Sequence, residues 1–236
     1  MRNRKRKEFK KAFVLTPTAL KGMIRNIAIP EEDLTYSVRC VDGSNLHPGS
    51  LEAIFALPNP RSRAINQISI GRRLVAKRLG PDIDITFEDS DFIPISYAID
   101  GEDLEVMQLS RVIEDHLEPM LQAYSIVSVG IPAQLAGIAL FWIGGALFGL
   151  GAGLLARGHK PLGIALLMFG AAISMIGLFA GRIRSSLFPA GVFCVGDGQA
   201  RFERSASIRK QLGLAAVIAL IIGIIASVIA NMVSLR

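Results

Sequence analysis

The stretch from Ile126 to Ala156, IVSVGIPAQLAGIALFWIGGALFGLGAGLLA, contains 31 residues and no charged side chain. Two later stretches share this property: Leu162 to Gly181 with 20 residues, and Gln211 to Leu235 with 25. A helix needs about 20 apolar residues to cross the hydrocarbon layer of a bilayer, where it satisfies its own backbone hydrogen bonds. We therefore expect three transmembrane helices, over residues 131–156, 162–181 and 212–234.

The overall composition agrees with a membrane protein. The chain has 236 residues, of which 51% are hydrophobic and 19% charged, and its mean hydropathy is +0.43. The hydrophobic share and the hydropathy lie above those of an ordinary soluble domain and the charged share lies below, which excludes a disordered or collagen-like chain. The only two cysteines, Cys40 and Cys194, lie too far apart in the sequence for a small disulfide-stapled fold. We interpret them as buried thiols in a reducing compartment.

The net charge of +6 is unevenly distributed along the chain. Residues 1–11 carry a net +6, residues 12–125 a net −7, and residues 126–236 a net +7. A nucleic-acid-binding domain concentrates cations on its folded body, whereas here the body is acidic. Nucleic acid is therefore not an expected partner, and the basic segment 1–11 is interpreted as a disordered tail that contacts anionic lipid.

The basic residues between the second and third apolar stretches predict the orientation in the membrane. Six Lys or Arg residues stand there against two acidic residues, which indicates the cytoplasmic side. We expect a multi-pass protein of the cell (inner) membrane with a cytoplasmic N-terminus and a C-terminus on the opposite side. The residues expected to fix topology or contact lipid are Arg2, Arg4, Lys5, Arg6, Lys7, Arg182, Arg184, Arg209 and Lys210.

Residues 12–125 have the patterns of a compact α+β domain. Apolar and polar residues alternate over 34–40, 83–88 and 93–99, as in strands that bury one face. A helical stripe that begins at Val106 would cover the sheet, and Thr16 followed by Pro17 predicts a helix start. The predicted fold class is thus a cytoplasmic α+β domain, an antiparallel sheet with covering helices, fused to an all-α three-helix transmembrane bundle over residues 126–236.

A cytoplasmic insert is expected between the second and third apolar helices. Apolar residues 192–195 and 200–202 flank the turn Gly196-Asp197-Gly198, a pattern typical of a β-hairpin. The sequence therefore predicts a β-hairpin over residues 187–204. So small a hairpin is marginal alone, and we expect it to dock on the sheet of the α+β domain.

The apolar stretches are rich in glycine. Small residues let helix backbones approach closely, which is how apolar helices associate in lipid. Two compatible interpretations remain open: packing of the first two helices within one chain, or a seam between copies in a homo-oligomer. The glycines expected to pack helices are Gly145, Gly149, Gly153, Gly170, Gly177, Gly181 and Gly223.

The sequence contains no recognisable catalytic, metal or cofactor motif. Its three histidines, His47, His116 and His159, have no spacing that brings two together as metal ligands. An EF-hand loop beginning at Asp89 would need Gly at its sixth position, where Pro94 stands. No catalytic residue, metal ligand or cofactor is therefore predicted.

These patterns favour a non-enzymatic integral membrane protein. Its cytoplasmic α+β domain would sense or bind a protein or small-molecule partner, and the Gly-rich three-helix bundle would anchor it, as a homo-oligomer. The alternative is an oligomeric gated pore or membrane-permeabilising effector. A membrane-bound enzyme is a third hypothesis, which rests only on scattered carboxylates.

Overall fold

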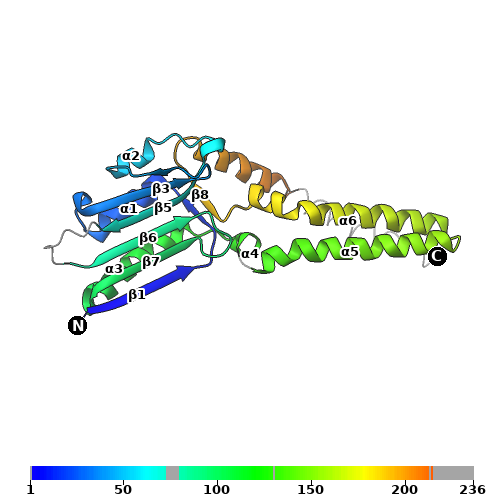
Figure 1. Cartoon of the computed structure of the whole chain (residues 1–236), viewed down its shortest axis with the longest axis horizontal. Coiled ribbons are helices and arrows are strands. Elements are labelled where there is room, and N and C mark those ends of the chain that lie inside the picture. The colour runs from blue at the N-terminus through cyan, green and yellow to red at the C-terminus, as the bar shows by residue number, and fades with distance from the viewer. Residues whose placement is uncertain (1, 73–79, 130, 213, 215–236) are drawn as a thin grey trace.

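The computed structural model describes residues 2–72, 80–129, 131–212 and 214. An α+β domain lies at one end, and a pair of long helices projects from it (Figure 1). The coarse prediction of an antiparallel sheet with helices, joined to long apolar helices, is confirmed for two such helices. The expected third helix, residues 212–234, lies outside the described residues except for 212 and 214.

The α+β domain is built on a six-stranded sheet in the order β1-β7-β6-β5-β3-β4, and each neighbouring pair is antiparallel. Alternation of apolar and polar residues sets its register: Ile85 lies opposite Tyr97, and both are buried, whereas Asp84 points to solvent. A slip by one residue would expose this apolar face. The strands are β1 (Arg2–Phe9), β3 (Leu34–Cys40), β4 (Asn45–Leu46), β5 (Ile65–Arg72), β6 (Asp82–Glu88) and β7 (Ile95–Glu102).

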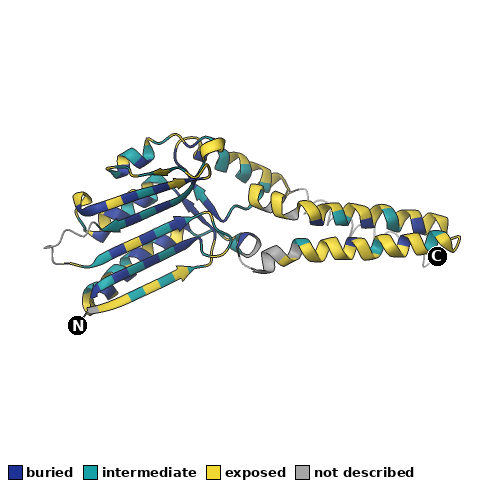
Figure 2. Cartoon of the chain, in the orientation of Figure 1, coloured by how far each residue is buried: buried dark blue, intermediate teal, exposed yellow. Residues whose placement is uncertain are grey.

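Helices cover one face of this sheet (Figures 1 and 2). Helix α1 (Pro17–Ile27) starts as predicted, because the Thr16 hydroxyl accepts a hydrogen bond from the backbone N–H of Ala19. Helix α3 (Asp103–Leu117) buries Val106 and Ile113 against the sheet. The remaining short elements of the domain are η1 (Glu31–Asp33), α2 (Leu51–Phe55), η2 (Arg61–Arg63), η3 (Glu118–Met120) and α4 (Ser125–Ser128).

The basic N-terminal segment is a strand, and the expectation of a disordered tail was wrong. Strand β1 pairs along its whole length with β7. Its lysines face α3, where Lys5 Nζ donates to Ser110 Oγ at 2.8 Å and Lys7 Nζ donates to Glu114 Oε2 at 2.6 Å. Burial acts to raise the pKa of Glu114, but the hydrogen bonds from Lys7 and Tyr97 outweigh it and lower the pKa to about 2. The acidic helix thus holds the basic strand in place.

A second, two-stranded sheet joins distant parts of the chain. Strand β2 (Phe13–Leu15) pairs in parallel with β8 (Gly191–Phe193). The predicted β-hairpin over 187–204 is therefore wrong in its second half, because residues 198–212 form a helix. Arg201 and Arg209 on this helix bond to the domain and to α6, and these contacts favour a helix over a second strand.

The two projecting helices are α5 (Ile131–Ala156) and α6 (Lys160–Leu187). They form a tight antiparallel hairpin, and Gly158 supplies the left-handed turn between them with φ +85°. Helix α5 has the predicted bounds of the first apolar helix. Helix α6 continues beyond its apolar stretch to Leu187, where it reaches the α+β domain.

Replacing Glu114 with Gln should loosen β1. The two lysines would lose their anionic partner, and we expect the free energy of unfolding to fall by about 1 kcal/mol, since the pair is partly screened by water. Amide hydrogen exchange over residues 2–9 should become faster. Because the folded-state pKa of Glu114 is depressed to about 2, its contribution is complete above the unfolded pKa and is lost as the pH falls from about 4.5 towards 2.

Asp115→Asn is the matched control, because Asp115 lies on the same helix and is exposed. It should leave the exchange of β1 unchanged. Equal exchange of β1 in wild type and in Glu114→Gln would contradict this assignment.

Candidate ligand groove between the domain and the helical hairpin

Helices α5 and α6 pack through glycines, which we call the glycine seam. A Cβ atom added to Gly170 would lie 2.5 Å from the backbone nitrogen of Phe148 and 2.7 Å from the carbonyl oxygen of Gly144. A Cβ atom on Gly144 would lie 2.7 Å from the carbonyl oxygen of Gly170 in return. No side chain fits at these distances, so glycine allows the backbones to meet. The other enclosed glycines of the seam are Gly151, Gly163 and Gly177.

The glycines expected to pack helices fall on two faces. Gly170 and Gly177 lie in the glycine seam. A Cβ atom on any of four others would meet nothing within 4 Å, and these are Gly145, Gly149, Gly153 and Gly181. Gly223 lies outside the described residues.

Seam glycines missed by the sequence reasoning recur every seven residues on α5, at Gly144 and Gly151. The same interval separates Gly163, Gly170 and Gly177 on α6. Seven residues are close to two helical turns, so an interval of seven shared by both helices was the signal for this face. The glycines at intervals of four on α5 lie on another face of the helix. Their spacing was therefore a misleading signal for the face that packs against α6.

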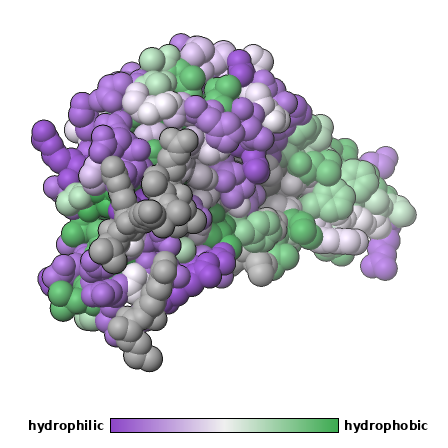
Figure 3. Space-filling model, turned by 60° about the vertical axis from the view of Figure 1, so that its left-hand side comes forward, coloured by the Kyte–Doolittle hydropathy of each residue, from purple (hydrophilic) through white to green (hydrophobic). Residues whose placement is uncertain are grey.

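The outer surface of the hairpin is apolar and exposed. Two segments, Gly137–Ala156 and Lys160–Phe179, are long and apolar enough to cross a membrane, and only 11% of each is buried. A core helix of a soluble protein would be mostly buried, and a signal sequence would lie near the N-terminus; neither describes these helices. Hydrophobic residues dominate the visible face of the hairpin, and hydrophilic ones return at its far end (Figure 3).

The chain enters and leaves the hairpin beside the same short segment, residues 12–15. Before α5, the backbone N–H of Gln122 donates to Ala12 O at 2.8 Å, and the backbone N–H of Ala12 donates to Ser125 Oγ at 3.0 Å. After α6, the N–H of Phe13 donates to Ala190 O at 3.0 Å. Phe13 is fully buried, with its ring 5.5 Å from that of Phe193. Both ends of the hairpin are therefore fixed to one buried strand.

Arg209 closes the junction from the helix over 198–212. Its guanidinium carbon lies 4.9 Å from the ring centroid of Tyr124 and 5.5 Å from that of Phe202. The same guanidinium donates to the carbonyl oxygen of Leu187, the last residue of α6. Arg209, expected to contact lipid, thus binds the end of α6 and two aromatic rings, a favourable setting for a cation.

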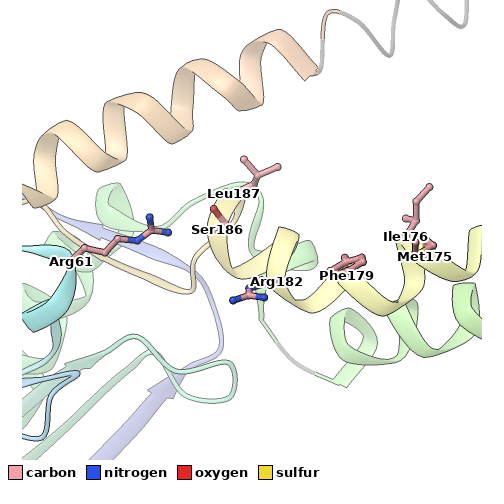
Figure 4. Close-up of a pocket in the computed structure, with 7 residues that line it drawn as sticks. All are labelled: Arg61, Met175, Ile176, Phe179, Arg182, Ser186 and Leu187. Atoms are coloured by element: carbon pink, nitrogen blue, oxygen red, sulfur yellow. The ribbon is translucent and has the colours of Figure 1, made fainter. Parts of the chain in front are cut away.

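Two adjoining cavities form a groove where the hairpin meets the domain, and we call it the junction groove. One cavity is about 740 Å³ and the other about 600 Å³. Arg61, Ser186 and Leu187 line both. The larger cavity lies between β8, the loop before β5 and the helix over 198–212. The smaller one runs along α6, as the labelled residues in Figure 4 show.

Buried polar residues shape the larger cavity. Asn59 is 1% exposed; its Oδ1 accepts from the backbone N–H of Ile65 at 2.9 Å, and its Nδ2 donates to Phe193 O at 3.2 Å. Arg201 donates to the carbonyl oxygen of Asn59 at 2.8 Å. Asn59 therefore ties the loop before β5 to β8. Its position between Pro58 and Pro60 was the one sequence signal that this residue is fixed.

Asp89 contributes a carboxylate to the same cavity. Burial raises its pKa above the ordinary value, while a hydrogen bond from the backbone N–H of Gly191, at 2.8 Å, acts in the opposite direction. The sequence offered only an incomplete EF-hand pattern at Asp89, whereas in the structure its carboxylate holds the start of β8. Asp89 therefore has a structural role.

The other residues expected to fix topology or contact lipid, besides Arg209, lie in different parts of the structure. Arg2, Arg4, Lys5, Arg6 and Lys7 belong to β1. Arg182 lines the smaller cavity, and Lys210 is exposed on the helix over 198–212. Arg184 lies on α6, and its side chain is outside the described part of the structure.

The described residues contain no cluster of three or more His, Cys, Asp or Glu side chains able to hold a metal ion. Cys40 and Cys194 are both free and buried. Burial raises the pKa of the Cys194 thiol to about 11, so it stays protonated and is a poor nucleophile at neutral pH. The junction groove is lined by arginines, serines, the two carboxylates of Asp89 and Asp197, and apolar side chains.

Comparisons with protein-family models, with curated proteins and with solved structures gave no match.

Gly170→Leu should disrupt the glycine seam. Leucine would force the two backbones apart, and overpacking of this kind costs about 1–3 kcal/mol. We expect the thermal midpoint of the detergent-solubilised protein, followed by circular dichroism, to fall by several degrees. Gly181→Leu is the matched control on the same helix, because its side chain would enter open space. Equal midpoints for the two variants would refute the seam.

Proposed function

We propose that this chain is a non-enzymatic integral membrane protein in which a cytoplasmic α+β domain binds a ligand or partner while apolar helices anchor it in the cell (inner) membrane. One observation carries the proposal: the chain segments that lead into and out of an exposed apolar hairpin are both hydrogen-bonded to residues 12–15 of the domain. In water, the exposed apolar surface of α5 and α6 would promote aggregation. In lipid, the same surface meets acyl chains.

The arrangement of cations supports the proposed orientation. Segment 182–210, which includes Arg182 and Arg204, carries six cations on the domain side of the hairpin. The far turn carries two, Arg157 and Lys160. The excess of cations on the domain side agrees with a cytoplasmic domain. The N-terminus then lies in the cytoplasm, and a third crossing over residues 212–234 would bring the C-terminus to the opposite side.

Binding in the junction groove would be coupled to the membrane helices. A ligand there contacts the loop that holds Asn59, strand β8 and the end of α6 at once. A ligand shifts a conformational equilibrium by its difference in affinity for the two states. A ligand bound between α6 and the domain is therefore placed to bias the position of the hairpin, which fits a sensing role.

Trp142 offers a direct test of insertion. It is the single tryptophan of the chain, it lies near the midpoint of α5, and it is 70% exposed. We expect lipids brominated near the ends of their acyl chains to quench its fluorescence more than lipids brominated near the carbonyl groups. The double variant Trp142→Phe/His47→Trp moves the fluorophore to the domain and should not be quenched. Absence of quenching in wild type would exclude a membrane-spanning α5.

A second candidate function is an oligomeric gated pore or membrane-permeabilising effector. The observation that favours it is the row Gly145, Gly149 and Gly153, which faces open space instead of α6. Such a row permits close approach of a second copy. In this case the homo-oligomer would surround an apolar path.

Crosslinking in native membranes tests the oligomer, and dye release from liposomes tests the pore. We expect crosslinked oligomers from the wild-type protein and monomers from Gly149→Leu/Gly153→Leu, because leucine would block close approach of the helices. Oligomers without dye release would favour the anchored binding protein over the pore. Monomers alone in wild type would exclude both the oligomer and the pore.

A further inference from the structure

The smaller cavity of the junction groove has an apolar wall on α6. Met175, Ile176 and Phe179 form this wall and are 59%, 54% and 50% exposed. They follow one another along the helix toward the domain (Figure 4). The wall is continuous with the exposed apolar surface of α6, so an acyl chain in the membrane can reach it without crossing water.

The domain end of this cavity is cationic. Arg182 on α6 and Arg61 on η2 both line it, and both are exposed. Among the described residues, no carboxylate forms an ion pair with either guanidinium. Two guanidinium groups at one end of a pocket, with no carboxylate ion-paired to either in the described part of the chain, have the charge and the hydrogen-bond donors to bind a phosphate.

The spacing of these groups matches the shape of a membrane lipid. Phe179 precedes Arg182 by three residues and Met175 precedes it by seven, which places the apolar wall over roughly 10 Å of helix below the arginine. Arg182 follows directly after the apolar stretch that ends at Gly181. In a bilayer, this puts the arginines at the level of the headgroups and the wall at the level of the acyl chains.

We propose that the junction groove binds an anionic phospholipid of the cytoplasmic leaflet, with its phosphate between Arg61 and Arg182 and one acyl chain along Met175, Ile176 and Phe179. This inference rests on the proposed membrane insertion. A soluble phosphate compound would satisfy the two arginines but would leave the apolar wall uncovered. A lipid covers both, and basic pockets on the cytoplasmic side of membrane helices suit anionic headgroups.

The bound lipid would link the domain to the membrane surface. Arg61 belongs to the domain and Arg182 to the membrane helix, so one phosphate bridges the two. The content of anionic lipid then becomes a signal that the domain can sense. This names the ligand class that the proposed function leaves open.

Native mass spectrometry of the full chain tests the proposal. The protein is delipidated in a neutral detergent and mixed with equal amounts of phosphatidylglycerol and phosphatidylcholine. We expect wild type to retain phosphatidylglycerol with roughly thirtyfold preference, as expected for two arginines near a membrane surface. Arg61→Gln/Arg182→Gln should bind the two lipids equally.

Arg157→Gln/Lys160→Gln is the matched control, since it removes two cations from the far turn of the hairpin; it should keep the preference. Circular dichroism shows whether each variant folds. If a variant fails to fold, the lipid preference of the wild-type protein still tests the proposal. Equal retention of both lipids by wild type would overturn the proposal. So would release of phosphatidylglycerol by equimolar glycerol phosphate, because a free phosphate would then be sufficient.

Trp142 quenching separates this inference from the proposed function. Quenching in bilayers together with no lipid preference would leave the anchor standing and remove the lipid site. If neither Trp142 quenching nor a lipid preference is observed, the proposed membrane insertion of the hairpin is excluded as well.

Discussion

The pairing of β2 with β8 is the constraint on which the rest of the structure depends. It joins residues that come before the helical hairpin to residues that come after it, so the domain closes around the base of α5 and α6. Parallel pairing requires a long crossover connection, and here that connection includes the whole hairpin. If the pairing were lost, the junction groove would lose β8. The hairpin would then be connected to the domain by two separate chain segments that are no longer paired through this sheet.

The two ends of the hairpin show different kinds of packing. At the domain, specific polar contacts fix it: Arg209 binds the end of α6, and Asn59 holds strand β8, which follows α6. Along its length, glycines let the two helix backbones meet, and Ser174 Oγ on α6 donates to Phe141 O on α5 at 3.4 Å. In the proposed membrane location, lipid would provide no hydrophobic force to press the helices against each other, and close backbone contact would take its place. The junction groove lies where these two kinds of packing meet, which is why it offers both charged and apolar walls.

Much of the fold could be predicted because local patterns carry it. The run from Ile126 to Ala156 defined α5, and alternation over 34–40 and 83–88 defined central strands. Contacts between residues far apart in the sequence could not be predicted, because local patterns carry no information about them. Strand β1 resembles a solvated tail until Glu114, more than a hundred residues away, is placed beside its lysines.

The candidate site was predicted only in part. Arg182 was singled out as a lipid contact, and it lines the junction groove. Arg61 and Asn59 were not, because their importance comes from segments near residue 190 that fold back onto them. The same fold-back turned the expected hairpin over 187–204 into strand β8 followed by a helix.

Cysteine labelling tests the proposed membrane insertion of the hairpin most directly. His159 at the far turn and His47 in the domain are both exposed, and the native Cys40 and Cys194 are buried. In spheroplasts, a membrane-impermeant maleimide should label His159→Cys, whereas His47→Cys should react only after the membrane is disrupted. Labelling of His47→Cys in intact spheroplasts, or protection of His159→Cys until lysis, would contradict the account.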